Sequence, residues 1–382
     1  MAFAPRHHDA VPRLDAWSLS IDGMRQPRRP ARGSRLEPGN RFTGRELVLD
    51  GDELDRDAEQ NEVASDRTRV FRDVSRSVIS RNDSPDIPFD RSLNPYRGCE
   101  HGCPYCYARP THEYLGLSAG LDFERTLFAK VDAPELLARE LAKPAWVPDQ
   151  LVLSGVTDPY QPIERTLRIT RGCLEVLAAH RHPVGLITKN ALVARDIDVL
   201  QDLASYGAVR VTLSLTTLNE ALGRCLEPRA STATDRLRAM QTLADAGVPV
   251  SVMAAPIIPG LNDHELPAIL EAAAAAGAHS AGWTLLRLPG AVEPIFSAWL
   301  REQLPLRAER ILAGLREARG GALSDARFGH RMRGEGVYAR QLGSLFDVHR
   351  RRAGLSGTGA ALDGSHFQVP GRPVQSRLFD RG

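Results

Sequence analysis

Three cysteines lie close together in the first third of the chain and could hold a metal centre. Cys99, Cys103 and Cys106 follow the pattern C-x3-C-x2-C, and Gly98 and Gly102 let the backbone of this loop turn tightly. A loop of this length can direct three thiolates at one centre. Iron–sulfur clusters usually take four cysteine thiolates. Three close thiolates without an obvious fourth therefore predict a cluster with one iron left open for substrate or cofactor, by analogy with the open position of catalytic zinc sites.

The same cysteines allow two other interpretations. They could form a structural zinc site completed by His101, His112 or a distant cysteine, although zinc patterns more often come as paired C-x2-C units or Cys/His pairs. They could also be unrelated to one another, packed in a core or paired in disulfides, although Cys103 and Cys106 are too close for a comfortable structural bridge. The spacing favours the iron–sulfur cluster.

The composition is that of a globular intracellular protein. The 382 residues are 42% hydrophobic and 25% charged, which is enough for one large core with extensions or for two modest domains. The net charge of +2 gives no global attraction to nucleic acid or to a membrane. No apolar run approaches the ~20 residues of a membrane span, and the N-terminus has no hydrophobic signal region. Together with an odd number of cysteines, this predicts a soluble cytoplasmic protein that makes no membrane contact.

From residue 91 onward, short apolar runs alternate with helical patterns. Most of the strands are continuous apolar runs, which indicates burial on both faces, and Gly247 and Gly277 lie where helices should end. Repeated β–α units with such strands predict an α/β fold with a parallel sheet, and six units predict a partial (β/α)6 TIM barrel. The predicted strands are Leu93–Arg97, Leu151–Val156, Val184–Thr188, Val209–Thr216, Val250–Ile257 and Gly282–Leu288; the predicted helices are Pro134–Ala142, Arg168–His180, Ala194–Tyr206, Thr234–Ala246, Glu265–Ala276 and Pro294–Arg319.

Extensions are predicted on both sides of the barrel, residues 91–290. Residues 1–60 are rich in Arg, Pro, Gly and Asp without a strand or helix period, which predicts a mostly disordered arm, and residues 61–90 form a lead-in segment. Residues 291–352 are predicted to form a helical C-terminal extension, followed by a flexible tail over 353–382. Basic and aromatic residues mix over Ala326–Arg352, which suits a helical cap, the favoured interpretation, or a nucleic-acid surface.

Several polar residues follow the predicted strands, and sites in such folds collect at the carboxyl ends of strands. Thr157 and Asp158 lie in a rigid turn after the second strand, where they suit an ordinary N-cap as well as a ligand. Lys189 emerges from the third strand, either to meet a carboxylate or to reach solvent at the rim. Ser214 in the fourth strand needs a hydrogen bond, which the backbone could also supply. Ile258 follows the fifth strand, in what taken alone is a plain strand-to-helix turn.

The cysteine motif, with the aromatic Tyr105 before its last cysteine, resembles the signature of the radical S-adenosylmethionine (SAM) enzymes. The stretches S-G-V-T-D-P-Y-Q-P-I-E, T-K-N and A-P-I-I-P-G-L-N-D after the second, third and fifth strands resemble the spore-photoproduct-lyase-like branch of this superfamily. The resemblance implies that the three cysteines hold a [4Fe–4S] cluster and that SAM chelates its fourth iron. It also implies that an external one-electron reductant, of the flavodoxin or ferredoxin type, drives cleavage of SAM to methionine and a 5′-deoxyadenosyl radical, which abstracts hydrogen from a substrate.

The resemblance further assigns roles to single residues at the positions that match. The implied cofactor-binding residues are Thr157 and Asp158 for the SAM amino group, Lys189 for its carboxylate, Ser214 for its ribose, and Tyr105 and Ile258 beside its adenine.

One position departs from the lyases. They carry a cysteine just before the turn that binds the amino group, where it returns hydrogen to the thymine product, whereas the matching residue here is Gly155. Photoproduct repair is therefore not expected. Tyr107 matches a tyrosine that flanks the third cysteine and is the candidate catalytic residue, as a radical relay. The sequence predicts a radical SAM enzyme with an unidentified substrate, for which nucleic acid or a nucleotide is favoured. The alternative is a zinc- or cluster-stabilised nucleic-acid-binding protein without catalysis.

Overall fold

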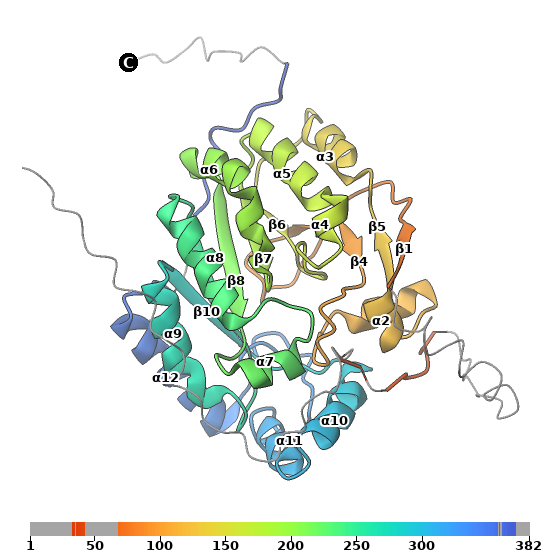
Figure 1. The fold of residues 1–382 in the computed structure, drawn as a ribbon, viewed down its shortest axis with the longest axis vertical. Coiled ribbons are helices and arrows are strands. Elements are labelled where there is room, and N and C mark those ends of the chain that lie inside the picture. Colours follow the sequence, from red (N-terminus) through yellow and green to blue (C-terminus); the bar gives the residue numbers. More distant parts are fainter. Residues whose placement is uncertain (1–32, 35, 43–67, 358, 360, 372–382) are drawn as a thin grey trace, which may run out of the picture.

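A parallel sheet runs through the centre of the computed structural model, which describes residues 33, 34, 36–42, 68–357, 359 and 361–371 (Figure 1). Six strands pair in parallel and in chain order, β3-β6-β7-β8-β9-β10, and β2 pairs antiparallel with β3. A second sheet has the order β1-β5-β4. The strands are β1 (Arg69–Arg72), β2 (Ile79–Arg81), β3 (Arg91–Leu93), β4 (Tyr96–Arg97), β5 (Thr126–Ala129), β6 (Leu151–Leu153), β7 (Val184–Thr188), β8 (Val209–Leu215), β9 (Val250–Ile257) and β10 (Ser280–Leu285).

The predicted α/β class with a parallel sheet in chain order is therefore confirmed. The edges of the large sheet are β10 and β2. Within the described ranges no strand pairing joins these edges, so the hydrogen bonds define an open sheet and not a closed barrel.

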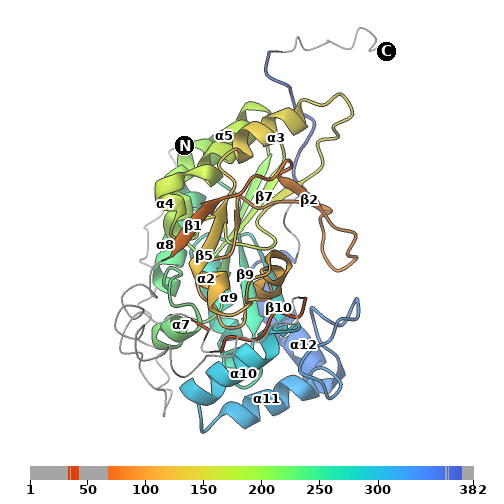
Figure 2. The same cartoon turned by 90° about the vertical axis from the view of Figure 1, so that its right-hand side faces the viewer.

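Helices cover the sheet and fill one of its ends. α5, α6, α8 and α9 follow one another along the outside of the sheet, and α10, α11 and α12 gather at one end of the molecule (Figures 1 and 2). Among the described helices, none combines the length and the apolar character that crossing a membrane requires. The helices are α2 (Leu121–Arg125), α3 (Ala133–Leu141), α4 (Glu164–Leu167), α5 (Ile169–Ala179), α6 (Ile197–Ser205), α7 (Glu220–Leu226), α8 (Ala233–Asp245), α9 (Leu266–Ala275), α10 (Val292–Gln303), α11 (Ala308–Glu317) and α12 (Gly336–Arg352), with 3-10 turns at η2 (Arg109–Thr111), η3 (Glu113–Leu115), η4 (Ala191–Asp196) and η5 (Asp263–Glu265).

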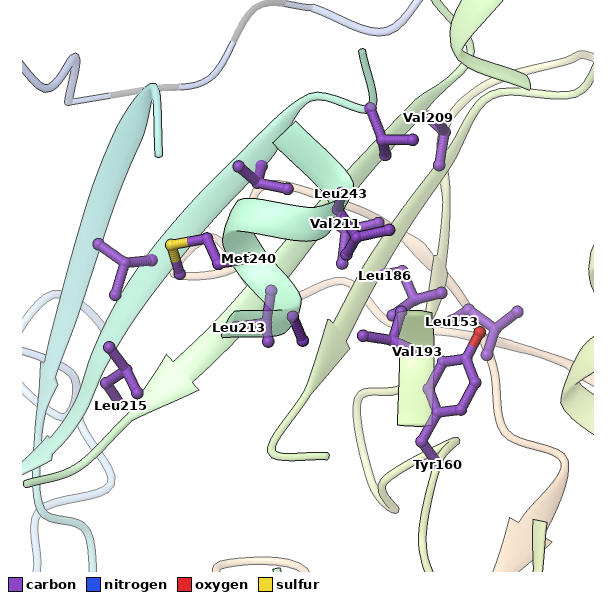
Figure 3. Close-up of a cluster of buried hydrophobic side chains, with 14 of the residues drawn as sticks. Leu153, Tyr160, Leu186, Val193, Val209, Val211, Leu213, Leu215, Met240 and Leu243 are labelled. Atoms are coloured by element: carbon purple, nitrogen blue, oxygen red, sulfur yellow. The ribbon is translucent and has the colours of Figure 1, made fainter. Parts of the chain in front are cut away.

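Strand β8 illustrates how the core is built. Val209, Val211 and Leu213 are buried, and the residues between them are half-buried, as expected for side chains that alternate between two faces. Met240 and Leu243 of α8 belong to the same buried cluster (Figure 3). Each such side chain contributes about 1.5–3 kcal/mol when it is fully buried. This packing holds the carboxyl end of β8 in place for the site described below.

The helix ends follow their local sequence. Thr232 caps α8, because its hydroxyl accepts a hydrogen bond of 3.1 Å from the backbone N–H of Asp235. Gly247 and Gly277 follow α8 and α9 with φ of 79° and 88°, as the sequence predicts. A Cβ on Gly277 would lie 2.5 Å from the Cβ of Ala244, so glycine also lets the C-terminal ends of the two helices approach each other.

Two predicted elements need correction. The predicted strand Leu93–Arg97 is split between β3 and β4, which belong to different sheets, and Pro95 between them cannot donate a ladder hydrogen bond. The predicted helix Pro294–Arg319 is split into α10 and α11. The break includes Pro305, which has no N–H for a continuous helix.

The predicted flexible tail also needs correction over its described part. The backbone N–H of Asp363 donates to Gly207 O at 3.0 Å, and the ring of Phe367 packs edge-on against His182 at a centroid distance of 5.6 Å. Gly207 and His182 directly precede β8 and β7. Residues 361–371, the C-terminal segment, therefore cross the amino ends of the strands; residues 372–382 lie outside the described residues.

Most of the predicted N-terminal arm, residues 1–60, also lies outside the described residues. The part that is described, residues 33, 34 and 36–42, is bonded to the fold: the Asn40 amide donates hydrogen bonds of 2.9 Å to the carbonyls of Glu113 and Leu117. The predicted division of the chain at residues 90 and 290 stays a prediction.

Candidate cofactor site

The cysteine loop, residues 98–107, connects β4 to η2. It begins at Gly98 with φ of 77°, and a Cβ there would lie 2.8 Å from Leu127 Cδ2 and 2.9 Å from His112 Cε1. Glycine is therefore needed for its conformation and for the close approach. The loop is anchored at its start by a hydrogen bond of 2.9 Å from the Cys99 N–H to Phe123 O.

A buried arginine fixes the middle of the cysteine loop. Arg109 is fully buried, and its Nε donates to Cys103 O at 2.9 Å. Its guanidinium also pairs with the buried carboxylate of Glu124 at 2.5 Å and donates to Ala119 O at 3.1 Å. Because a buried charge is tolerated only when it is paired and hydrogen-bonded, this geometry strongly restrains the carbonyl of Cys103.

The N-terminal segment, residues 33, 34 and 36–42, lies against the same loop. Glu124 accepts hydrogen bonds from the backbone N–H of Gly33 at 3.0 Å and of Ser34 at 2.7 Å. A Cβ on Gly33 would lie only 1.4 Å from the carbonyl oxygen of Gly102. The backbones of the segment and the cysteine loop are therefore in direct contact, and no side chain fits between them.

Gln161 joins the cysteine loop to the turn after β6. Its Oε1 accepts a hydrogen bond of 2.9 Å from the Glu100 N–H, and its Nε2 donates one of 3.1 Å to Gly98 O. Gln161 is fully buried. Glu100 in turn pairs with Arg229 at 3.0 Å, so two distant parts of the chain, at Gln161 and Arg229, shape the loop.

The three thiols of the loop form a donor set that fits a thiolate-ligated cluster. All cysteines are free. Burial, followed by the charges of Asp158 and Cys106, raises the pKa of the Cys99 thiol, and burial together with Glu227 raises that of Cys103. A bound centre must therefore displace protons from these thiols as it takes thiolate ligands. Within the described residues, no three His, Cys, Asp or Glu side chains are placed to share a single metal ion.

The two histidines considered as zinc ligands have protein partners. His101 Nδ1 lies 3.5 Å from Asp158 Oδ2, and His112 Nε2 lies 2.9 Å from Thr126 O. Burial lowers the pKa of both imidazoles, so both are neutral at pH 7.

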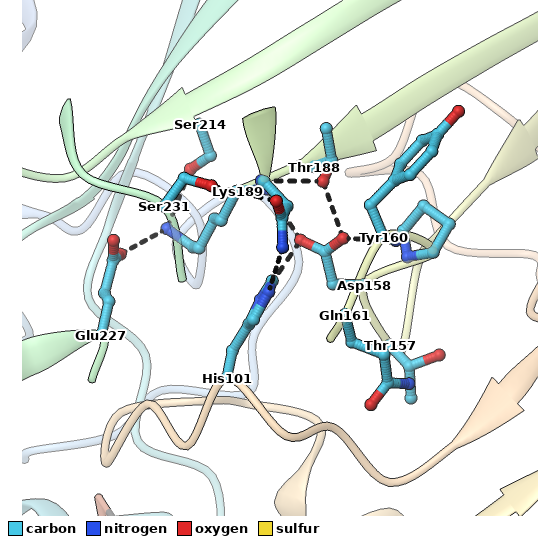
Figure 4. Close-up of polar contacts among 12 residues, drawn as sticks. His101, Thr157, Asp158, Tyr160, Gln161, Thr188, Lys189, Ser214, Glu227 and Ser231 are labelled. Carbon is cyan, nitrogen blue, oxygen red and sulfur yellow. Dashed lines mark hydrogen bonds and ion pairs between the residues drawn. The ribbon is translucent and has the colours of Figure 1, made fainter. Parts of the chain in front are cut away.

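Lys189 is a cation of the site and lies at the carboxyl end of β7 (Figure 4). Its Nζ is 2.7 Å from Glu227 Oε1, 3.0 Å from Ser214 Oγ, 2.9 Å from Thr216 Oγ1 and 3.1 Å from Ala255 O. Of the two interpretations that the sequence allows for this lysine, the geometry therefore favours the carboxylate partner over solvent. It also places the hydroxyl of Ser214 beside Lys189.

Glu227 is a buried carboxylate between two cations. Burial alone would raise its pKa, but Arg236 and Lys189 outweigh burial and hold the pKa well below its usual range. Arg236 pairs with the Oε2 atom, and the hydroxyl of Tyr105 donates to Oε1. Tyr105 comes from the cysteine loop, so Glu227 connects that loop to Lys189.

Asp158 and Thr157 shape the turn after β6. Asp158 accepts hydrogen bonds of 2.7 Å from the hydroxyl of Thr188 and from the backbone N–H of Lys189, so it lies beside the lysine. The hydroxyl of Thr157 instead donates to the carbonyl of Tyr96 at 3.0 Å. The structure brings Asp158 to the site, whereas the Thr157 side chain bonds to the backbone beneath the turn.

The remaining predicted residues border the cysteine loop. Ile258 is fully buried and belongs to the same apolar cluster as Tyr105 and Cys103. The side chain of Tyr107 is half exposed, and its hydroxyl donates to Gly155 O at 2.6 Å.

Sequence analysis did not identify three residues that the structure places at this site: Gln161, Glu227 and Arg236. Gln161 lies inside the motif after β6 that the sequence singled out, so its position was a usable signal. Glu227 and Arg236 lie outside every motif. Only the tertiary structure brings them to Lys189.

With the fold and the site in view, the class of domain can be stated. The family model of the Radical SAM superfamily matches residues 93–273, a stretch that contains the cysteine loop and strands β6 to β9. These residues match the radical SAM domain, in agreement with the superfamily that the sequence motifs resemble.

Relatives occur in bacteria and archaea. The protein Rv2578c of Mycobacterium tuberculosis strain H37Rv is 36% identical over 221 residues, which cover 57% of this chain and 65% of the relative. The protein MJ0683 of Methanocaldococcus jannaschii is 29% identical over 173 residues, 45% of this chain and 62% of the relative. The chain thus spans somewhat less than two thirds of the length of each.

Among solved structures, spore photoproduct lyase has a similar fold. Its complex with a dinucleoside spore photoproduct has a TM-score of 0.55 at 16% identity, over 75% of this chain and 80% of the lyase. A variant with bound AdoMet and the same dinucleoside has a TM-score of 0.55 over 82% of this chain and 87% of the lyase. At this identity the likeness concerns the fold, and it agrees with the branch that the sequence motifs resemble.

Proposed function

We propose that this protein is a radical SAM enzyme in which Cys99, Cys103 and Cys106 hold a [4Fe–4S] cluster. One observation carries the proposal: a loop with three free thiols is bonded through Tyr105 and Glu227 to a lysine at the carboxyl edge of the parallel sheet. When reduced, the cluster supplies the electron that cleaves SAM to methionine and a 5′-deoxyadenosyl radical.

The residues of the chain bind and orient SAM. Lys189 offers its ammonium to the SAM carboxylate, Asp158 its carboxylate to the amino group and Ser214 its hydroxyl to the ribose. Ile258 and Tyr105 provide an apolar wall for adenine, in the cluster that also contains Cys103. Thr157 supports the turn that carries Asp158 through its bond to Tyr96 O. Burial of these groups excludes water, which a reactive radical requires.

The wider reaction is proposed on the same basis. An external one-electron reductant of the flavodoxin or ferredoxin type supplies the electron, and the radical abstracts hydrogen from a nucleic acid or nucleotide. Two features support this substrate class: the motifs shared with the lyase branch and the half-exposed ring of Tyr107 beside Arg287, whose guanidinium lies 5.8 Å from the ring centroid. We place the protein in the cytoplasm, since its cysteines are free, and assign the sheet to a partial (β/α)6 barrel.

The test is anaerobic reconstitution with iron and sulfide, reduction with dithionite and an assay for 5′-deoxyadenosine formed from SAM without added substrate. The Cys106→Ala variant is the control. Production by the wild-type protein above this control is the expected result. A colourless protein that binds zinc would contradict the cluster. A brown, cluster-loaded protein that does not bind SAM in calorimetry would contradict the enzyme and support a cluster-stabilised nucleic-acid-binding protein.

A further inference from the structure

One buried carboxylate collects bonds from four separate parts of the chain. The oxygens of Glu227 accept from Tyr105 of the cysteine loop, Lys189 at the end of β7, Thr216 after β8 and Arg236 of α8. The side chain of Glu227 is 3% exposed and that of Arg236 is 4% exposed. Partners from this many elements hold the carboxylate in a single position.

The charges around Lys189 balance one another. Lys189 and Arg236 are cations, Glu227 is an anion, and the carboxylate of Asp158 accepts a hydrogen bond of 2.7 Å from the backbone N–H of Lys189. A ligand at Lys189 is therefore recognised through the hydrogen bonds of its ammonium group.

The hydrogen bonds of Lys189 can be rearranged to admit a ligand carboxylate. An ammonium group has three protons, whereas its Nζ already lies within 3.1 Å of four acceptors. A ligand carboxylate can therefore replace a neutral acceptor, such as the hydroxyl of Ser214 or the carbonyl of Ala255, while Glu227 keeps its bond. In that arrangement Glu227 fixes the direction from which Lys189 meets the ligand.

We propose that Glu227 is a positioning residue that couples the cysteine loop, through the hydroxyl of Tyr105, to the SAM-binding lysine. The inference rests on the proposed function, because it concerns the same site. Glu227 holds Lys189 and the loop in register, so that SAM can meet the lysine through its carboxylate and the open iron of the cluster at the same time. Glu227 touches neither SAM nor the cluster.

The experiment compares Glu227→Gln, Tyr105→Phe and the double variant with the wild-type protein. Three quantities are measured: iron per chain, the dissociation constant of SAM for the loaded protein, and the change that SAM causes in the electron paramagnetic resonance spectrum of the reduced cluster. Loss of a charged hydrogen bond predicts that Glu227→Gln binds SAM about 10-fold more weakly or worse, and that Tyr105→Phe binds it about 5-fold more weakly. Both variants keep their iron and lose most of the SAM-induced spectral change.

If the two residues are coupled, the loss of SAM affinity in the double variant is smaller than the product of the losses in the two single variants. Tyr105 acts through Glu227, so Tyr105→Phe adds little in the Glu227→Gln background. The matched control is Glu265→Gln, at a carboxylate near the same edge of the sheet that bonds to Thr217 and Leu218. The control should bind SAM with the wild-type dissociation constant.

Two results would overturn the inference while the proposed function stands. One is wild-type SAM affinity and spectral change in Tyr105→Phe, and the other is independent, multiplying effects in the double variant. Glu227→Gln could lose its iron because two buried cations are left unpaired. In that case Tyr105→Phe alone tests the inference, since it leaves the bond between Lys189 and Glu227 intact. Failure of the wild-type protein itself to bind SAM would overturn the proposed function, and this inference with it.

Discussion

The hydroxyl of Tyr107 donates a hydrogen bond of 2.6 Å to the carbonyl of Gly155, which ties the end of the cysteine loop to the turn after β6. Gly155 has φ of 108°, and a Cβ there would lie 3.3 Å from the Cβ of Ser92. A cysteine in the backbone conformation of this turn would be strained by about 1–3 kcal/mol. The position that the motif resemblance matches to a cysteine of the lyases is therefore shaped here for glycine.

Tyr107→Phe should separate a structural role from a radical relay. The side chain is half exposed, so loss of its hydrogen bond should lower the free energy of unfolding by about 1 kcal/mol or less. The rate of 5′-deoxyadenosine formation without added substrate (uncoupled cleavage) should stay within about twofold of the wild-type rate, since a relay acts after SAM cleavage. Chemical denaturation and the cleavage assay measure the two quantities. A large loss of uncoupled cleavage would assign Tyr107 to the SAM site and not to a relay.

Gln161→Ala should weaken the hold on the cysteine loop. The change leaves the Glu100 N–H and the Gly98 carbonyl without their partner, and each buried group left unpaired costs about 1–3 kcal/mol. Denaturation of the metal-free protein and the iron content after reconstitution should both show the loss. Gln201→Ala, which removes an exposed hydrogen bond to Ala246 O, is the matched control. Equal behaviour of the two variants would mean that Gln161 does not shape the loop.

Gly33→Ala tests whether the N-terminal segment covers the cysteine loop in solution. The added Cβ would lie 1.4 Å from Gly102 O, so either the segment or the loop has to move. Gly39→Ala, in the same segment, adds a Cβ with no atom within 4 Å. Release of iron to a chelator should be several-fold faster for Gly33→Ala and unchanged for Gly39→Ala. Identical release rates would place the segment away from the loop.

Stability should fall as the pH is lowered from 6.5 to 4 because of His182. Its Nε2 accepts a hydrogen bond of 3.1 Å from the Trp146 indole, which requires the neutral ring, whereas its Nδ1 donates to Pro183 O at 3.0 Å in either protonation state. Burial lowers the pKa of His182 from 6.5 to about 4. The unfolded chain therefore takes up a proton first as the pH falls, and about 3 kcal/mol of stability is lost across this range.

Denaturation curves at several pH values and an NMR titration of His182 check this prediction. Trp146→Phe removes the indole donor, which should raise the pKa of His182 and flatten the pH dependence. His264→Gln, at a half-exposed histidine, should leave the dependence unchanged. A pKa of His182 near 6.5 in the folded wild-type protein would show that the prediction is wrong.

Parts of the fold follow directly from local sequence. Strands β7 and β9 were predicted with their observed ends, because each is an apolar run and β-branched residues favour strands. Lys189 was identified because a cation directly after a buried strand needs a partner. The cysteine spacing singled out the candidate cluster ligands, because three thiols within one short loop are typical of a metal centre.

Other parts depend on contacts that no local pattern encodes. Glu227 follows a short helix and precedes a proline, which is typical of a surface turn, and only its distant partners reveal its burial. The C-terminal segment has the composition of a mobile tail. It is nevertheless bound, because Phe367 meets His180 and His182 at the amino ends of the strands. Composition measures how much apolar surface a segment has, but it does not measure whether a complementary surface exists elsewhere.

The shape of the cysteine loop depends on residues that are synthesised long after it. Gln161 lies 61 residues beyond Glu100, to which it bonds, and Glu227 lies 122 residues beyond Tyr105. A growing chain presents its three thiols well before the glutamine and the carboxylate that hold the loop in place. Contacts of such long range form late in folding. Under the proposed function, iron and sulfide are therefore delivered after the fold is complete, and the cell must keep these thiols reduced until that time.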